Sequence, residues 1–185
     1  MNAIAHPNVF YRSCATRGAG DLPVAIDDLI VACRAAGADL VIVETPGIGQ
    51  GDAGIVDHVD LPIYVMTPEF GAASQLEKID MLDHAVAVVV NKFERRGGLD
   101  ALRDVRRQFA RLRGYSGPLD ALPVFGTVAS RFNDDGVTAL YGHLVDELSA
   151  RTTLQCGPGV LARVEGREST GVHEALVPPS RVRYL

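Results

Sequence analysis

The sequence is short of cysteine and of long apolar runs, and each shortage excludes a class of protein. The three cysteines, Cys14, Cys33 and Cys156, are widely separated and form no Cys-x-x-Cys spacing. This spacing argues against a zinc site and favours buried or bystander thiols in a reducing compartment. The longest apolar stretches, such as residues 86–90, fall far short of the about 20 residues that span a bilayer. Residues 1–8 contain no long apolar run, so we expect no signal peptide there.

Positive charge is scarce as well. A net charge of -5 and a pI near 5.5 argue against nucleic acid as the main partner. With 185 residues, of which 47% are hydrophobic, the chain can bury one sizeable core. We therefore expect a cytoplasmic protein with one domain and a tail, and with neither a membrane nor a nucleic-acid partner.

Four short apolar runs alternate with helical patterns. The runs are typical of strands buried in a parallel sheet, and lie at Asp39–Val43, Leu61–Met66, Val86–Val90 and Leu122–Phe125. Helices are predicted at Pro23–Ala36 with a stop at Gly37, at Gln75–Asp83, at Leu99–Leu112, and from a cap at Asp134 or Asp135 to about Leu148. This alternation predicts a doubly wound, mainly parallel α/β fold over residues 1–150. Frequent Gly and Pro predict an extended linker over 151–185, with one short strand at 160–164.

A glycine-rich loop follows the first predicted strand, where ligands of α/β sheets gather. Residues 44–50 read Glu-Thr-Pro-Gly-Ile-Gly-Gln. Gly47 and Gly49 would let the backbone approach a phosphate closely, and Glu44 is a hard oxygen donor suited to Mg²⁺. A structural turn with a solvated glutamate explains these residues equally well.

A second loop, Asn91-Lys92-Phe93-Glu94, follows the third predicted strand. Asn91 can bond a purine edge and nearby backbone, and the Lys92 stem can lie over the ring. The Glu94 carboxylate only accepts hydrogen bonds, so it would prefer guanine over adenine. The alternative is a surface Asn-Lys pair opening a helix. The usual third element, a Gly-x-x-x-x-Gly-Lys-Ser/Thr phosphate cradle, is missing from the chain.

Several segments together resemble one family, the GTPase chaperones of cobalamin-dependent acyl-CoA mutases, and especially the members that share one polypeptide with their mutase. The matching segments cover nearly the whole chain: Arg12–Gly18, Val43–Gln50, Tyr64–Ala73, Gln75–Met81, Leu99–Arg106 and Arg181–Leu185. The resemblance implies a P-loop GTPase-like sheet from which the P-loop strand is missing.

The resemblance also implies a role for each matched segment. Residues 12–18 match switch I, and residues 44–50 match switch II, with Glu44 near Mg²⁺ and Gly47 near the γ-phosphate. Residues 68–78 match a third switch that senses the mutase. Lys78 and Gln50 would support hydrolysis, since a cation can stabilise developing phosphate charge; a surface lysine is the competing interpretation for Lys78. The base-facing residues would be Asn91, Lys92, Glu94, Thr127, Val128 and Ala129, the last loop acting mainly through backbone amides.

The chain departs from the family in three ways. Glu94 stands where the family usually has Asp. The chain also lacks the phosphate cradle and any Asp-x-His-x-x-Gly cobalamin motif. The resemblance therefore places GTP or GDP and Mg²⁺ in an intact parent, which is expected to be a homodimer, and cobalamin only in domains outside this chain. In the fold that the resemblance implies, the P-loop strand lies between the strands expected at 39–43 and 61–66. Its absence would leave backbone groups of both strands unpaired, so we expect marginal stability. The missing cradle would supply most of the phosphate contacts, so we also expect weak GTP binding.

Three functions remain in competition. The first is a GTP-binding chaperone segment of a fused mutase of the isobutyryl-CoA or methylmalonyl-CoA type, inactive alone. The second is a nucleotide-independent module that docks on a mutase through its third-switch helix and an arginine-rich face. That face, around residues 95–113, is otherwise explained as a solvated helix surface. A free-standing hydrolase comes last, because nothing else in the chain could hold a triphosphate.

Overall fold

A computed structural model describes residues 6–15, 22–46, 53–71, 76–153, 164 and 166–170. These fall into two compact units, residues 1–48 and 49–185. In the first unit, helix α1 spans Ile26–Ala35. Gly37 follows it with a left-handed φ of 88°, and the amides of Gly37 and Ala38 bond back to Arg34 and Cys33. The predicted helix and its glycine stop are thus confirmed.

The strand expected at Asp39–Val43 is wrong for this structure. Residues 40–46 form no regular secondary structure, and the side chains of Leu40 and Ile42 are 51% and 84% exposed. An apolar run becomes a strand only when a neighbouring strand pairs with its backbone amides and carbonyls. No strand of the described residues pairs with this segment.

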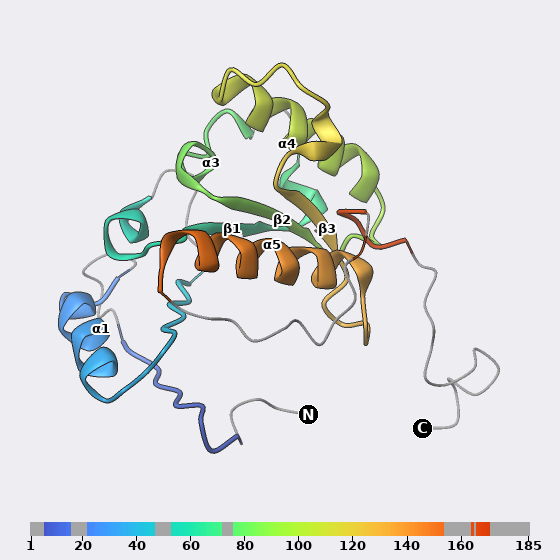
Figure 1. The fold of residues 1–185 in the computed structure, drawn as a ribbon. Coiled ribbons are helices and arrows are strands. Elements are labelled where there is room, and N and C mark those ends of the chain that lie inside the picture. The colour runs from blue at the N-terminus through green and yellow to red at the C-terminus, as the bar shows by residue number, and fades with distance from the viewer. Residues whose placement is uncertain are drawn as a thin grey trace. The chain divides into compact units, whose positions relative to one another are not determined.

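The second unit is built on a three-stranded parallel sheet of order β1-β2-β3 (Figure 1). Its strands are β1 (Ile63–Met66), β2 (Ala87–Asn91) and β3 (Val124–Thr127). Val89 of the central strand pairs with Val65 on one side and Phe125 on the other. The α/β class and three of the predicted strands are confirmed.

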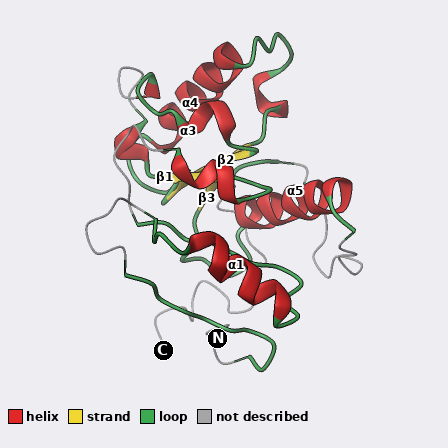
Figure 2. Ribbon diagram, turned by 90° about the vertical axis from the view of Figure 1, so that its left-hand side faces the viewer, coloured by secondary structure: helices red, strands yellow, loops and turns green. Residues whose placement is uncertain are grey.

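Helices cover both faces of this sheet. Figures 1 and 2 show α3 (Met81–His84) and α4 (Gly98–Leu112) on one face and α5 (Asp135–Arg151) on the other. Short 3₁₀ turns, at Gly54–His58, Pro68–Phe70 and Leu119–Ala121, connect these elements. No described helix has the length and apolarity that a membrane crossing needs.

The helix expected at Gln75–Asp83 is interrupted. Leu76 is helical, residues 77, 78 and 80 lie in turns, residue 79 has no regular structure, and Met81–His84 form α3. The apolar positions of the pattern, Leu76, Ile79 and Leu82, are nevertheless buried in the core beside α4. The periodicity therefore identified which side chains face inward but not the backbone conformation.

A short piece of the predicted linker returns to the sheet. Glu168 forms a parallel bridge with Gly126 of β3, and the Gly126 amide and carbonyl bond to Arg167 and Ser169, each at 2.9 Å. The strand expected at 160–164 lies outside the described residues, apart from Val164.

Candidate functional site

The candidate site lies at the carboxyl ends of β2 and β3. Asn91 and Thr127 are register partners in the last row of this strand pair. The Asn91 Oδ1 accepts hydrogen bonds from the Thr127 hydroxyl and from the Ala129 amide, each at 3.2 Å. Three residues that the sequence assigned to one base-facing site are therefore joined directly.

The loop after β2 is held by close backbone packing. The Phe93 amide donates to the Thr127 carbonyl at 3.0 Å, which extends the pairing beyond the strands. A Cβ on Gly126 would lie 2.9 Å from the Phe93 ring, and one on Gly98 would lie 2.2 Å from the Phe93 carbonyl oxygen. Both glycines are thus required by the position of Phe93.

Lys92 and Glu94 flank this packed phenylalanine, and both side chains are exposed. Lys92 adopts a left-handed φ of 55°, a conformation that is uncommon outside glycine, asparagine and aspartate and is often found at functional sites. The loop therefore presents an ammonium group and a carboxylate to solvent while Phe93 anchors it.

The loop after β3 is fixed by Asp134, which precedes α5. Its Oδ1 accepts from the Val128 amide at 3.2 Å and from the Val137 amide at 3.0 Å. The sequence predicted a helix cap at Asp134 or Asp135, and in the structure Asp134 is the cap. The contact with Val128 was missed, because nothing in a linear pattern shows that a cap also reaches the preceding loop.

Together these groups form a set of donors and acceptors that runs from the buried Thr127 and Val128 to the exposed Lys92, Glu94 and Ala129. Because the Asn91 Oδ1 is occupied twice from within, its amide nitrogen is the atom left to donate to a ligand. A purine N7 is an acceptor suited to such a donor. The exposed Lys92 and Glu94 add a cation and an acceptor beside it.

The third-switch segment is tied to α4 and the loop before it by two ion pairs. Glu69 pairs with Arg95 at 2.6 Å, and Glu77 pairs with Arg111 at 2.9 Å. A hydrogen bond from Thr67, and then the bond from Arg95, lower the pKa of Glu69 to about 2. Lys78, the expected hydrolytic lysine, is exposed.

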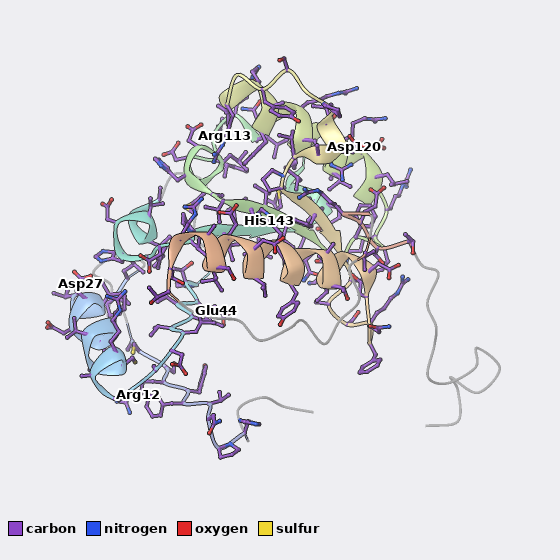
Figure 3. All side chains as sticks on the ribbon, in the orientation of Figure 1. Arg12, Asp27, Glu44, Arg113, Asp120 and His143 are labelled. Carbon is purple, nitrogen blue, oxygen red and sulfur yellow. The ribbon has the colours of Figure 1, made fainter. Side chains whose placement is uncertain are left out.

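Most of the arginine-rich face is paired within the chain. Arg103 and Arg107 bond acids on their own helix. Arg113, at the end of α4 (Figure 3), donates to the Ala85 carbonyl at 2.7 Å. This pairing weakens the case for a nucleotide-independent docking module.

The remaining predicted residues belong to the switch II loop. Gly47 and Gln50 lie outside the described residues, and Glu44 is an exposed side chain of the first unit (Figure 3). In the part of the chain that the structure describes, no three His, Cys, Asp or Glu side chains gather as a metal site. The role of Glu44 toward Mg²⁺ stays a prediction.

Comparison with known proteins gives a consistent result. The family model "Methylmalonyl Co-A mutase-associated GTPase MeaB" matches residues 1–145. Proteins described as "Fused isobutyryl-CoA mutase" match over the whole chain: 63% identity in Nocardia farcinica, 61% in Cupriavidus metallidurans and 54% in Paraburkholderia xenovorans. The chain spans 17% of the length of the first two relatives and 15% of the third.

Proposed function

Because the chain belongs to the MeaB family of methylmalonyl Co-A mutase-associated GTPases, we propose that it is the base-recognising part of a guanine-nucleotide-binding chaperone domain. The observation that carries this proposal is the double hydrogen bond of Asn91 to Thr127 and Ala129. It joins the loops after β2 and β3 and leaves the Asn91 amide nitrogen as the group that can donate to a base.

In this proposal, each side chain has one task. Asn91 donates to the purine N7, and the Lys92 stem covers the face of the ring. Glu94 accepts from the guanine N1 and N2 groups, which adenine cannot match. Thr127, Val128 and Ala129 shape the wall beside the base.

The phosphate end of the nucleotide belongs to other residues. Gly47 contacts the γ-phosphate, Glu44 binds Mg²⁺ directly or through water, and Gln50 and Lys78 assist hydrolysis. Since the chain contains no Gly-x-x-x-x-Gly-Lys-Ser/Thr motif, most phosphate contacts must come from elsewhere. GTP should therefore bind this chain orders of magnitude more weakly than an intact GTPase. A nanomolar or low-micromolar affinity would contradict this.

The partner is an acyl-CoA mutase domain, as the fused relatives suggest. In a parent of that kind, residues 1–150 form part of the GTPase domain and residues 151–185 link it to the mutase. Cobalamin and acyl-CoA bind to domains outside this chain. The parent is a cytoplasmic homodimer in this proposal.

A nucleotide titration followed by NMR tests the base site in the chain itself. GMP is the suitable probe, because it carries the base without requiring a triphosphate site. We expect GMP, but not AMP, to shift the amide signals of residues 91–95 and 127–130. Asn91→Ala should abolish the response, whereas the matched variant Lys78→Ala should retain it. Equal responses to both nucleotides, or none to GMP, would refute base recognition.

A further inference from the structure

Asp134 makes more contacts than a helix cap needs. Its side chain is 2% exposed, and one oxygen, Oδ1, serves both the first turn of α5 and the Val128 amide. The other oxygen, Oδ2, is buried without a hydrogen-bond partner in the described part of the chain. A cap alone requires only the bond to Val137.

The additional bond falls in the middle of the base-facing wall. Val128 lies between Thr127 and Ala129, both of which bond to Asn91. Two side chains, Asn91 from β2 and Asp134 from the start of α5, thus fix three consecutive residues from two directions. Val128 is itself 2% exposed, so water cannot readily replace Asp134 as the acceptor for its amide.

We propose that Asp134 is a positioning residue for guanine recognition, acting through the Val128 amide. The inference rests on the proposed function, because it assumes that residues 127–129 face a base. Loss of the bond would leave a buried amide without an acceptor, which costs free energy unless the loop moves. Movement of Val128 would carry Ala129 away from Asn91 and disturb the wall of the site.

Two substitutions separate the cap from the loop contact. Asp134→Ser keeps a good cap for α5 but is too short to bond Val137 and Val128 together. Asp134→Asn keeps an acceptor oxygen at the same place and serves as the conservative rescue. Asp134→Ala removes both functions and calibrates the loss of stability.

Hydrogen exchange of the Val128 amide and the GMP dissociation constant test the proposal. In Asp134→Ser, the Val128 amide should exchange with solvent faster while Val137 stays protected, and the GMP dissociation constant should rise about tenfold or more. Asp134→Asn should resemble the unaltered chain in both. Thermal unfolding should show that Asp134→Ser loses less stability than Asp134→Ala, because it keeps the helix cap. GMP binding is measured well below the unfolding transition of each variant, so that weaker binding is not a folding defect.

The outcomes distinguish this inference from the function on which it rests. Unchanged Val128 exchange, or unchanged GMP affinity, in Asp134→Ser would overturn the positioning role while base recognition stands. Loss of binding in Asp134→Asn together with normal Val128 protection would also overturn it. No GMP binding by the unaltered chain would refute the proposed function itself.

Discussion

Single residues control how closely α5 approaches the sheet. A Cβ on Gly136, in the first turn of α5, would lie 1.9 Å from the carbonyl oxygen of Gly126 and 3.1 Å from the Ser169 amide nitrogen. Both neighbours are backbone atoms in β3 and in the returning segment, so neither can rotate away. Gly142, in the same helix, has no atom within 4 Å of a Cβ built on it.

The two glycines therefore form a matched pair of tests. We expect Gly136→Ala to lower the free energy of unfolding by about 2–3 kcal/mol through overpacking. Gly142→Ala should instead raise it by about 0.5–1 kcal/mol, because alanine loses less backbone entropy in a helix. Urea denaturation followed by circular dichroism measures both. Equal effects at the two positions would contradict the described packing of α5.

Glu69 should make stability depend on pH in a defined window. Its folded pKa, about 2, lies below the value of about 4.3 for an unperturbed glutamate. The folded state thus binds this proton less readily, and the stabilisation is complete above about pH 5 and declines as pH falls toward 2. Comparing the urea midpoints of the unaltered chain and Glu69→Gln between pH 6 and 2.5 tests this.

We expect the gap between the two midpoints to shrink as pH falls through that window. Added salt should also reduce the gap, because the Glu69 and Arg95 side chains are 51% and 50% exposed and ions screen such pairs. A gap that stays constant with pH would show that Glu69 contributes through packing alone.

At the scale of the elements, the arginine at the end of α4 bonds to the neighbouring helix region, whereas an arginine on its exposed side does not. Arg113 bonds the carbonyls of Ala85 and Asp83, beside α3, at 2.7 and 3.2 Å. Its guanidinium also lies 4.5 Å from the centre of the Phe109 ring. Arg107, by contrast, pairs with Asp104 one turn away, at 3.4 Å, and with no other acid among the described residues.

We therefore expect unequal effects from two alanine substitutions in this region. Arg113→Ala should lower the free energy of unfolding by about 1–2 kcal/mol, because it leaves two carbonyls without their charged donor. Arg107→Ala should change it by less than about 0.5 kcal/mol. Chemical denaturation of both variants gives the comparison, and a larger loss for Arg107 would refute this account of α4.

Local sequence patterns predicted helices and their caps better than they predicted which strands pair. The helix stripe over Leu99–Leu112 and the cap at Asp134 depend on neighbours in sequence, and α4 and α5 formed as expected. The segment 39–43 is as apolar as the runs that became strands, but no strand in the described part of the chain pairs with it. Strand formation there depends on a distant ladder that composition cannot reveal. For the same reason, the bridge between Glu168 and Gly126 was not foreseen.

In the candidate site, too, the sequence predicted the residues but not the contacts between them. The residue types and spacing of Asn91, Lys92 and Glu94 predicted one loop of the site, and the resemblance to the GTPase chaperones predicted Thr127, Val128 and Ala129 as the other. The hydrogen bonds that join them come from the register of β2 and β3, which sequence patterns leave open. The dual contact of Asp134 likewise needed the folded path of the loop.

In the whole molecule, the hydrophobic core belongs to the second unit. Every member of the core cluster lies between Ala53 and Val124. In the described part of residues 1–48, Ile26 is the one buried hydrophobic residue, at 8% exposure, while Phe10, Val24 and Ile42 are at least 80% exposed. The first unit therefore has too little buried apolar surface to offset the entropy of ordering its backbone.

This difference predicts that residues 49–185 fold without residues 1–48. The slope of unfolding free energy against urea concentration scales with the surface exposed on unfolding. We expect the 49–185 fragment to unfold cooperatively with nearly the slope of the full chain, and the 1–48 fragment to give a coil-like circular dichroism spectrum. If residues 1–48 shared the cooperative core, the slope of the full chain would instead exceed that of the fragment by roughly a third, in proportion to chain length. A slope of that size, or an unfolded 49–185 fragment, would show that the first unit is part of the folding core.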